Sequence, residues 1–154
     1  MSIKYFMNKE VVSIDKSSSI LDACKLMKKE NVGFLLVTDN LNLAGVITDR
    51  DITTYLADGS LNHRIEHAMT KSVETINVNS YPEDVSDLMG YKQIKRLVVV
   101  DDLENVVGVI GVSDLVRDEF TSHLALEALK EIYFEYKKTY IPPQQALKVD
   151  DFPL

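Results

Sequence analysis

The sequence predicts an α+β fold in which two β-α-β-β-α repeats pack sheet to sheet about an approximate twofold axis, followed by a C-terminal helix. A motif occurs twice, as Gly-Val-Ile-Thr-Asp-Arg-Asp at residues 45–51 and as Gly-Val-Ile-Gly-Val-Ser-Asp at residues 108–114. An apolar run that ends in an acidic residue precedes each copy, at residues 34–39 and 97–101. One repeat has too few apolar residues to form a stable domain, so we expect the two to share a core.

The spacing of matched residues defines the two repeats. Met7 and Met69 are 62 positions apart, and Gly45 and Gly108 are 63 apart, so the second repeat carries a single inserted residue. We place it in the turn before Gly108, where insertion costs little. The chain then divides into residues 1–60 for the first repeat, 61–120 for the second, and 121–154 for a C-terminal helix and tail.

In the first repeat, residues 11–14 form a short strand and residues 16–19 supply a helix N-cap. The helix over residues 19–29 has the i, i+3, i+4, i+7 spacing of an amphipathic helix, with a buried stripe of Ile20, Ala23, Cys24 and Met27. We interpret Cys24 as a core residue, because its one basic neighbour is too little to activate a thiol. Two strands joined by a polar turn at residues 40–43 follow.

The second repeat has the same design. Ser80 is the predicted N-cap of its helix and Pro82 lies early in that helix. The side chains that face inward are Val85, Leu88 and Met89. The turn between its last two strands is predicted at residues 102–105.

Residues 118–138 have helical spacing outside the repeats, with apolar residues on two faces. One face consists of Phe120, Leu124, Ala128 and Ile132, and the other of Leu126, Leu129, Tyr133 and Tyr136. Two apolar faces predict that this helix packs on its own body and also contacts a second chain. A membrane-surface helix is the weaker alternative, because an anionic membrane would repel Glu127, Glu131 and Glu135. Residues 141–143 end the helix, and the tail to Leu154 is expected to be loosely ordered or to dock.

Composition narrows the class of protein. The 154 residues carry a net charge of −7 without a basic block, which argues against a nucleic-acid partner. One cysteine permits no intrachain disulfide, and three scattered histidines do not suggest a metal site. Neither a signal peptide nor an apolar run long enough to cross a bilayer is visible, so we expect a cytoplasmic protein with no membrane partner.

The end of the repeated motif has its own chemistry. Thr48, Asp49, Arg50 and Asp51 follow a buried strand and open a helix, where free N–H groups and the helix dipole favour an anion. Thr48 can donate to a phosphate oxygen while Asp51 accepts from sugar hydroxyls. A simple helix cap is the alternative, and for a single copy the cap is favoured.

Further segments carry a family resemblance. They are Met69-Thr70, residues 31–37, residues 94–101 and both copies of the motif. With these segments the chain resembles a tandem pair of CBS domains (a Bateman module) of the stand-alone type, over roughly residues 3–120. The doubling makes the resemblance far more specific than one short motif.

The resemblance implies a regulatory protein that binds AMP, ADP or ATP between its repeats, or less often S-adenosylmethionine or NAD, with no catalytic residues and no bound cofactor or metal. In such pairs the motif aspartate holds the ribose and a hydroxyl residue three positions earlier contacts phosphate. The first cleft would then be formed by Asp51, Thr48, Ile94 and Lys95, with Arg50 as an added cation or a solvated surface residue. The second cleft would be formed by Asp114, Ser113, Lys95, Arg96, Val32 and Gly33. Backbone groups at Ser13, Ile14, Thr75 and Ile76 would read the base.

Two departures make the clefts unequal. Gly111 stands where the first copy has Thr48, and Phe34 stands where the second repeat has Arg96. The first cleft therefore keeps a hydroxyl and lacks the arginine, while the second has the arginine and lacks the hydroxyl. An arginine fork binds phosphate bidentately, so we expect it to matter more than one hydroxyl.

Three functions are compatible with these residues. The first is a nucleotide-sensing module that forms a homodimer and alters the affinity of a regulated partner. The second is an interaction module with degenerate clefts that acts through its C-terminal helix and tail. The third, an enzyme, is disfavoured because no nucleophile–base pair, metal cluster or carboxylate pair stands out.

Overall fold

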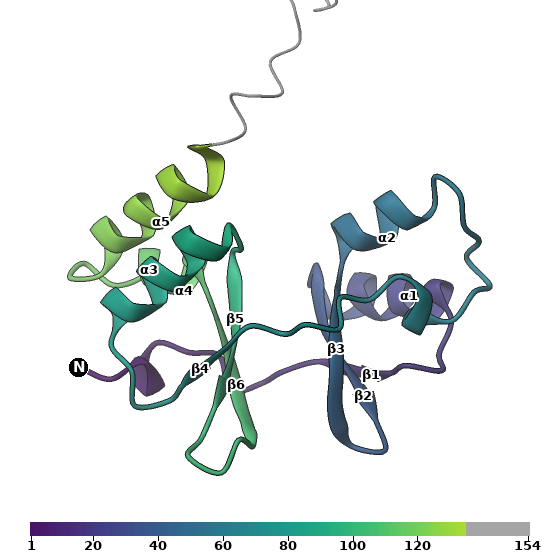
Figure 1. The fold of residues 1–154 in the computed structure, drawn as a ribbon, viewed down its shortest axis with the longest axis horizontal. Helices are drawn as coiled ribbons and strands as arrows, with labels where there is room; N and C mark the ends of the chain where they lie inside the picture. The colour runs from purple at the N-terminus through teal and green to yellow at the C-terminus, as the bar shows by residue number, and fades with distance from the viewer. Residues whose placement is uncertain (135–154) are drawn as a thin grey trace, which may run out of the picture.

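The computed structural model describes residues 1–134, and within them both repeats have the predicted β-α-β-β-α order (Figure 1). The first repeat comprises β1 (Ser13–Asp15), α1 (Ile20–Glu30), β2 (Phe34–Asp39), β3 (Asn42–Thr48) and α2 (Asp49–Tyr55). The second comprises β4 (Thr75–Asn77), α3 (Pro82–Lys92), β5 (Arg96–Val100), β6 (Val106–Gly111) and α4 (Val112–Val116). A 3-10 turn precedes each repeat, η1 (Ile3–Tyr5) and η2 (Ile65–His67), and the last described helix is α5 (Ser122–Phe134).

Each repeat forms its own three-stranded sheet. The strand orders are β1-β2-β3 and β4-β5-β6, with the first pair parallel and the second antiparallel in both sheets. Both antiparallel pairs shift register at the same place, between Val37 and Thr38 and between Val99 and Val100. The α+β fold class is thus confirmed. The two repeats also share the position of their register shift.

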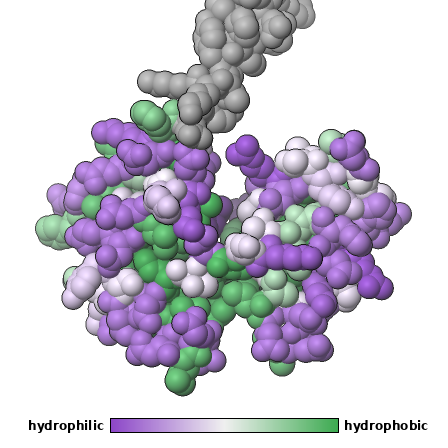
Figure 2. Space-filling model, in the orientation of Figure 1, coloured by the Kyte–Doolittle hydropathy of each residue, from purple (hydrophilic) through white to green (hydrophobic). Residues whose placement is uncertain are grey.

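The two sheets pack on each other through an apolar layer. Its buried centre consists of Leu36, Val98 and Val100, with partly buried residues from both repeats around them. Figure 2 shows hydrophobic residues across the middle of the visible face, where the repeats meet. This layer confirms the predicted packing of sheet against sheet.

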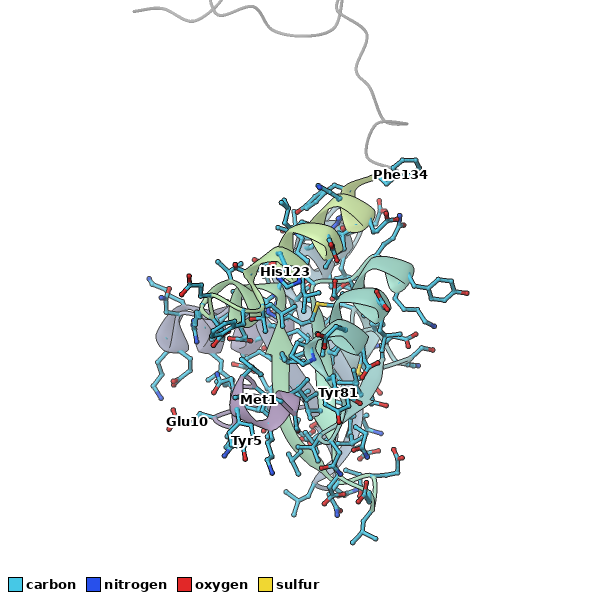
Figure 3. All side chains as sticks on the ribbon, turned by 90° about the vertical axis from the view of Figure 1, so that its left-hand side faces the viewer. Met1, Tyr5, Glu10, Tyr81, His123 and Phe134 are labelled. Carbon is cyan, nitrogen blue, oxygen red and sulfur yellow. The ribbon has the colours of Figure 1, made fainter. Side chains whose placement is uncertain are left out.

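The segment that precedes each repeat belongs to the core of the other repeat. Ile3 is fully buried in the core of the second repeat, and its N–H donates to the carbonyl of Ser80 at 2.9 Å. Met1 accordingly lies near Tyr81 at the start of α3 (Figure 3). Ile65, just before the second repeat, is fully buried in the core of the first. The chain therefore crosses between the repeats twice.

The crossing segments explain why both motif copies begin with glycine. Asn8 pairs with Val109 and Thr70 pairs with Val46, each as an isolated antiparallel bridge. A Cβ at Gly45 would lie 2.7 Å from the carbonyl oxygen of Thr70. At Gly108 the corresponding distance to the carbonyl oxygen of Asn8 is also 2.7 Å. Side chains at these positions would collide with backbone that is itself held by hydrogen bonds.

Within the two repeats, the helix starts agree with the sequence except at α3. Ser19 caps α1 as predicted, in a reciprocal capping box with Asp22, and hydrogen bonds from Ser19 lower the pKa of the Asp22 carboxyl. The prediction of Ser80 as the cap of α3 is wrong, because the N-cap is Tyr81. Pro82 takes the first helical position, so the residue directly before it must be the extended cap. The carboxylate of Asp84 accepts from the Tyr81 N–H at 2.8 Å.

The C-terminal helix packs on its own body, as predicted. Leu124, Ala125 and Ala128 are buried against the second repeat, and the Ser86 hydroxyl of α3 donates to the Leu124 carbonyl at 2.8 Å. The helix begins at Ser122 rather than at residue 118, so Phe120 lies before it and is exposed instead of joining the buried face.

On the second predicted face of α5, Leu126 and Tyr133 are partly exposed while Leu129 packs on the core, and Phe134 lies at the far end (Figure 3). Glu135, Tyr136, the remaining predicted helix to residue 138 and the tail lie outside the described residues. No helix within residues 1–134 combines the length and apolarity needed to span a bilayer.

Two glycine-to-serine changes in β6 test the crossing contact. We expect Gly108→Ser to lower the free energy of unfolding by about 1–3 kcal/mol, because its Cβ has no room beside the Asn8 carbonyl. Gly111→Ser is the matched control: a Cβ there approaches no atom closer than 3.4 Å, and a hydroxyl at this N-cap position stabilises α4 by a few tenths of a kcal/mol. Denaturant unfolding followed by circular dichroism measures both. Equal stabilities for the two variants would contradict the tight crossing.

Candidate functional site

The motif aspartate of the second repeat lies at the opening of α4, at the third helical position. Its Oδ2 accepts a hydrogen bond from the Gly111 N–H at 2.8 Å, and its Oδ1 lies 3.4 Å from Nη1 of Arg117. The Asp114 side chain is 12% exposed. A carboxylate in this position both caps the helix and faces a cleft.

The motif aspartate of the first repeat takes part in a complete capping box. Its Oδ2 accepts from the Thr48 N–H and from the Thr48 hydroxyl, each at 2.8 Å, and the Thr48 hydroxyl oxygen accepts from the Asp51 N–H at 3.1 Å. The helix-cap alternative is thus confirmed for Thr48. The cap leaves the second carboxylate oxygen of Asp51 without a hydrogen bond or ion pair to any residue in the described part of the chain.

A cleft of about 230 Å³ opens between the repeats beside Asp114. Five residues predicted for the second site line it together: Asp114, Ser113 and Arg96 from the second repeat, and Val32 and Gly33 from the first. The residues of the two repeats are more than 60 positions apart in the sequence, and the sheet-to-sheet packing brings them to one place. The geometry therefore assembles most of the predicted second site.

Phe34 and Arg96, which replace each other in the two repeats, meet in this cleft. The guanidinium carbon of Arg96 lies 5.8 Å from the centroid of the Phe34 ring. Both residues line the cleft. The ring supports the guanidinium through a cation–π contact and leaves its N–H groups able to bind an anion. The departure at Phe34 thus assists the arginine of the other repeat.

The four residues predicted to read the base do not line the Asp114 cleft. Ser13 lines a separate groove of about 250 Å³ near the β2–β3 hairpin, together with Lys9 and Thr38. Ile14 packs against the core of the first repeat, and Ile76 is buried in the core of the second. Thr75, the partner of Val98 in β4, is exposed.

The remaining residues predicted for the two clefts, Lys95, Ile94 and Arg50, lie in three different places. The Lys95 ammonium lies 4.8 Å from the centroid of the Tyr133 ring on α5, and Lys95 is not among the residues that line the Asp114 cleft. Ile94 packs partly against the core of the second repeat. Arg50 is exposed on the first turn of α2.

Sequence reasoning missed several residues of the Asp114 cleft, among them Val11, Val12, Glu10 and Arg117. Val11 and Val12 form part of its wall. They lie two residues before the predicted Ser13 and Ile14, because the crossing segment passes the cleft before β1 begins. Glu10 and Arg117 add one charge of each sign. Arg117 could have been found from its spacing, three residues after Asp114 on the same helix. Within residues 1–134, no group of three or more His, Cys, Asp or Glu side chains is placed to hold a metal ion.

Comparisons with known proteins agree with this architecture. The family model for the CBS domain matches residues 3–58 and 65–119. The CBS domain-containing protein YhcV of Bacillus subtilis is 34% identical over 135 residues, which cover 85% of this chain and 94% of that protein. Other relatives are longer, and the chain spans 34% of one of them and 22% of another.

Solved structures show the same fold. The CBS domain protein TA0289 of Thermoplasma acidophilum, described as of unknown function, has a TM-score of 0.77 at 22% identity and covers 94% of this chain and 83% of its own. The CBS domain pair of protein MJ0100, in complex with 5′-methylthioadenosine and S-adenosyl-L-methionine, has a TM-score of 0.69 at 30% identity over 76% of this chain and 94% of its own. From the doubled motif, the paired sheets and these matches together, the chain belongs to the CBS domain family as a tandem pair of CBS domains.

Proposed function

We propose that this CBS pair is a regulatory module that binds an adenine nucleotide, AMP, ADP or ATP, between its repeats. The observation that carries the proposal is the Asp114 cleft, where the carboxylates of Asp114 and Glu10, two arginines and apolar walls from both repeats meet. No catalytic role is assigned to any residue of the cleft. We expect the protein to act in the cytoplasm by changing the affinity of a partner.

Each part of the cleft suits one part of a nucleotide. The Asp114 carboxylate can accept hydrogen bonds from two sugar hydroxyls. The apolar side chains of Val11, Val12 and Val32 offer walls for a flat base. Arg96 offers a cationic group with several N–H donors to phosphate. The adenosine-based ligands of the MJ0100 pair support the choice of base, and the arginines support phosphate.

Binding in this cleft would couple the repeats. Its walls come from both sheets, and the segment from Asn8 to Val12 that crosses between the repeats forms one side. A ligand that contacts both repeats stabilises one relative arrangement of them, and a partner that reads this arrangement responds to the ligand.

An interaction module remains the second candidate, because α4 and α5 expose large apolar side chains. Val116 is 56% exposed, Leu126 55% and Phe134 71%. Such a surface is compatible with the homodimer that we expect, and it could serve a partner protein even if the clefts bind nothing.

A thermal-shift panel tests the sensor function. We expect ATP, ADP or AMP to raise the melting temperature, because a ligand at 100 times its dissociation constant adds about 2.7 kcal/mol to the free energy of unfolding. GTP serves as the matched control for charge and phosphate, and S-adenosylmethionine, 5′-methylthioadenosine and NAD cover the other adenosine ligands. The absence of a shift with every adenosine compound at millimolar concentration would favour the interaction module.

Substitution of the motif aspartate separates its two roles. We expect Asp114→Ala to weaken nucleotide binding at its own cleft about tenfold or more, since a charged hydrogen-bond acceptor is lost, and to destabilise the fold by about 1 kcal/mol because α4 loses its cap. Asp84→Ala is the matched control, because Asp84 caps α3 with the same 2.8 Å bond and lies outside the cleft lining. Calorimetric titration that finds equal affinities for both variants would remove Asp114 from the site.

A further inference from the structure

Met7 and Met69 lie at equivalent places in the two crossing segments, directly against the motif glycines. The sulfur of Met7 is 3.0 Å from the position that a Cβ would take at Gly108. At Gly45 the corresponding distance to the sulfur of Met69 is also 3.0 Å. Both methionines are partly buried, Met7 against the core of the second repeat and Met69 against the core of the first. Each thioether thus packs where the missing side chain leaves the backbone bare.

The surroundings of each sulfur suit an apolar thioether and not a polar group. Beside Met7, the N–H and carbonyl groups of Asn8 and Val109 bond to each other, at 2.8 and 2.9 Å. The bridge beside the other sulfur has the same two bonds, each of 2.9 Å, between Val46 and Thr70. The N–H groups of these bridges are therefore already used. An oxygen atom added to either sulfur would find no donor among them and would have to turn toward water.

The five methionines of the chain differ in their access to solvent. Met1 is 78% exposed, whereas Met27 is 7% exposed and Met89 is fully buried. Met7 and Met69 lie between these extremes, and exposed residues follow each of them along the chain. We therefore expect a dissolved oxidant to reach the two crossing methionines in the folded protein, more slowly than it reaches Met1.

We propose that Met7 and Met69 are sites of reversible oxidation by peroxide, and that their oxidation loosens the contact between the two repeats. A lone pair of the sulfur attacks one oxygen of hydrogen peroxide, and the O–O bond breaks. The hydroxide that leaves takes the proton from the transferred oxygen and becomes water. The sulfur is thereby oxidised to a sulfoxide and the peroxide is reduced. Methionine sulfoxide reductases reverse the change.

The sulfoxide acts on the joint between the repeats. It is polar where the thioether was apolar, so it leaves the glycine to reach water, and the crossing loses a packing contact. Oxidation of Met7 also affects the Asp114 cleft, because Asn8 and Val109 both line it. A weaker bridge between these two residues changes one wall of the cleft, whichever ligand the cleft holds.

Peroxide treatment of the full chain tests whether the two sulfurs react. Peptide mass spectrometry identifies each oxidised methionine. In the folded protein we expect Met1 to oxidise first and Met7 and Met69 to follow, while Met27 and Met89 stay reduced. If Met7 and Met69 stay reduced at a dose that oxidises Met1 completely, the proposal is overturned.

Hydrogen exchange followed by NMR tests the loosening. In the oxidised protein we expect the bridge amides of Asn8, Val46, Thr70 and Val109 to exchange about tenfold faster or more, with a smaller change inside α1 and α3. Reductases for both sulfoxide epimers should restore the slow exchange. Every sample carries Cys24→Ala, so that the thiol does not react with peroxide. An equal change across all amides would indicate general destabilisation and would overturn the proposal.

Matched leucine variants assign the effect to the two sulfurs. Met7→Leu with Met69→Leu keeps apolar side chains of similar volume that cannot form a sulfoxide, so exchange at the bridges should no longer respond to peroxide. Met27→Leu with Met89→Leu removes two buried sulfurs instead and should leave the response complete. A full response without the crossing sulfurs would assign the effect to another residue. That result, or unchanged exchange when both crossing methionines are fully oxidised, would overturn the proposal.

Discussion

The packing of one sheet on the other depends on two backbone crossings at which a chain segment from one repeat lies against a motif glycine of the other. At both glycines a Cβ would stand 2.7 Å from a carbonyl oxygen, so the close approach requires glycine at each. The crossings bring Ile3 into the second core and Ile65 into the first, so neither repeat has a complete core without a segment from outside it. Separation of the repeats would expose these isoleucines as well as the layer around Leu36 and Val98.

The cleft follows from the same geometry. In the second repeat, the strand that contains the motif glycine ends at the opening of a short helix, where Asp114 accepts a backbone hydrogen bond that caps the first turn and also lines the cleft. The hydrogen bond at the start of α4 holds the Asp114 carboxylate in place, and the first repeat supplies residues of the opposite cleft wall. Asp114 thus caps the helix and lines the cleft with the same side chain, so a cap and a place in the proposed ligand site are compatible.

The sequence contains the repeats, the helix stripes and the cap of α1 as local patterns, and these were predictable. The set of Asp114, Arg96, Val32 and Gly33 in one cleft was also predictable, through the family resemblance. The exchange of Ile3 and Ile65 between cores was not, because hydrophobic spacing does not tell which sheet a buried residue reaches. Ser13 illustrates the same limit: it lines a separate groove, while Val12, one residue earlier, lines the Asp114 cleft, since alternate residues of an extended segment face opposite sides.

The second repeat has several features that the first repeat lacks. Gly111, Arg96 and Arg117 stand there in place of Thr48, Phe34 and Thr54, and only the second repeat carries α5 on its helices. Lys95, directly before β5, contacts Tyr133 of α5, while the adjacent Arg96 lines the cleft. Two consecutive cations thus have different surroundings, one beside the Tyr133 ring of α5 and the other in the cleft. The second repeat therefore joins the lining of the cleft to α5 through two adjacent residues, an arrangement that the first repeat does not have among residues 1–134.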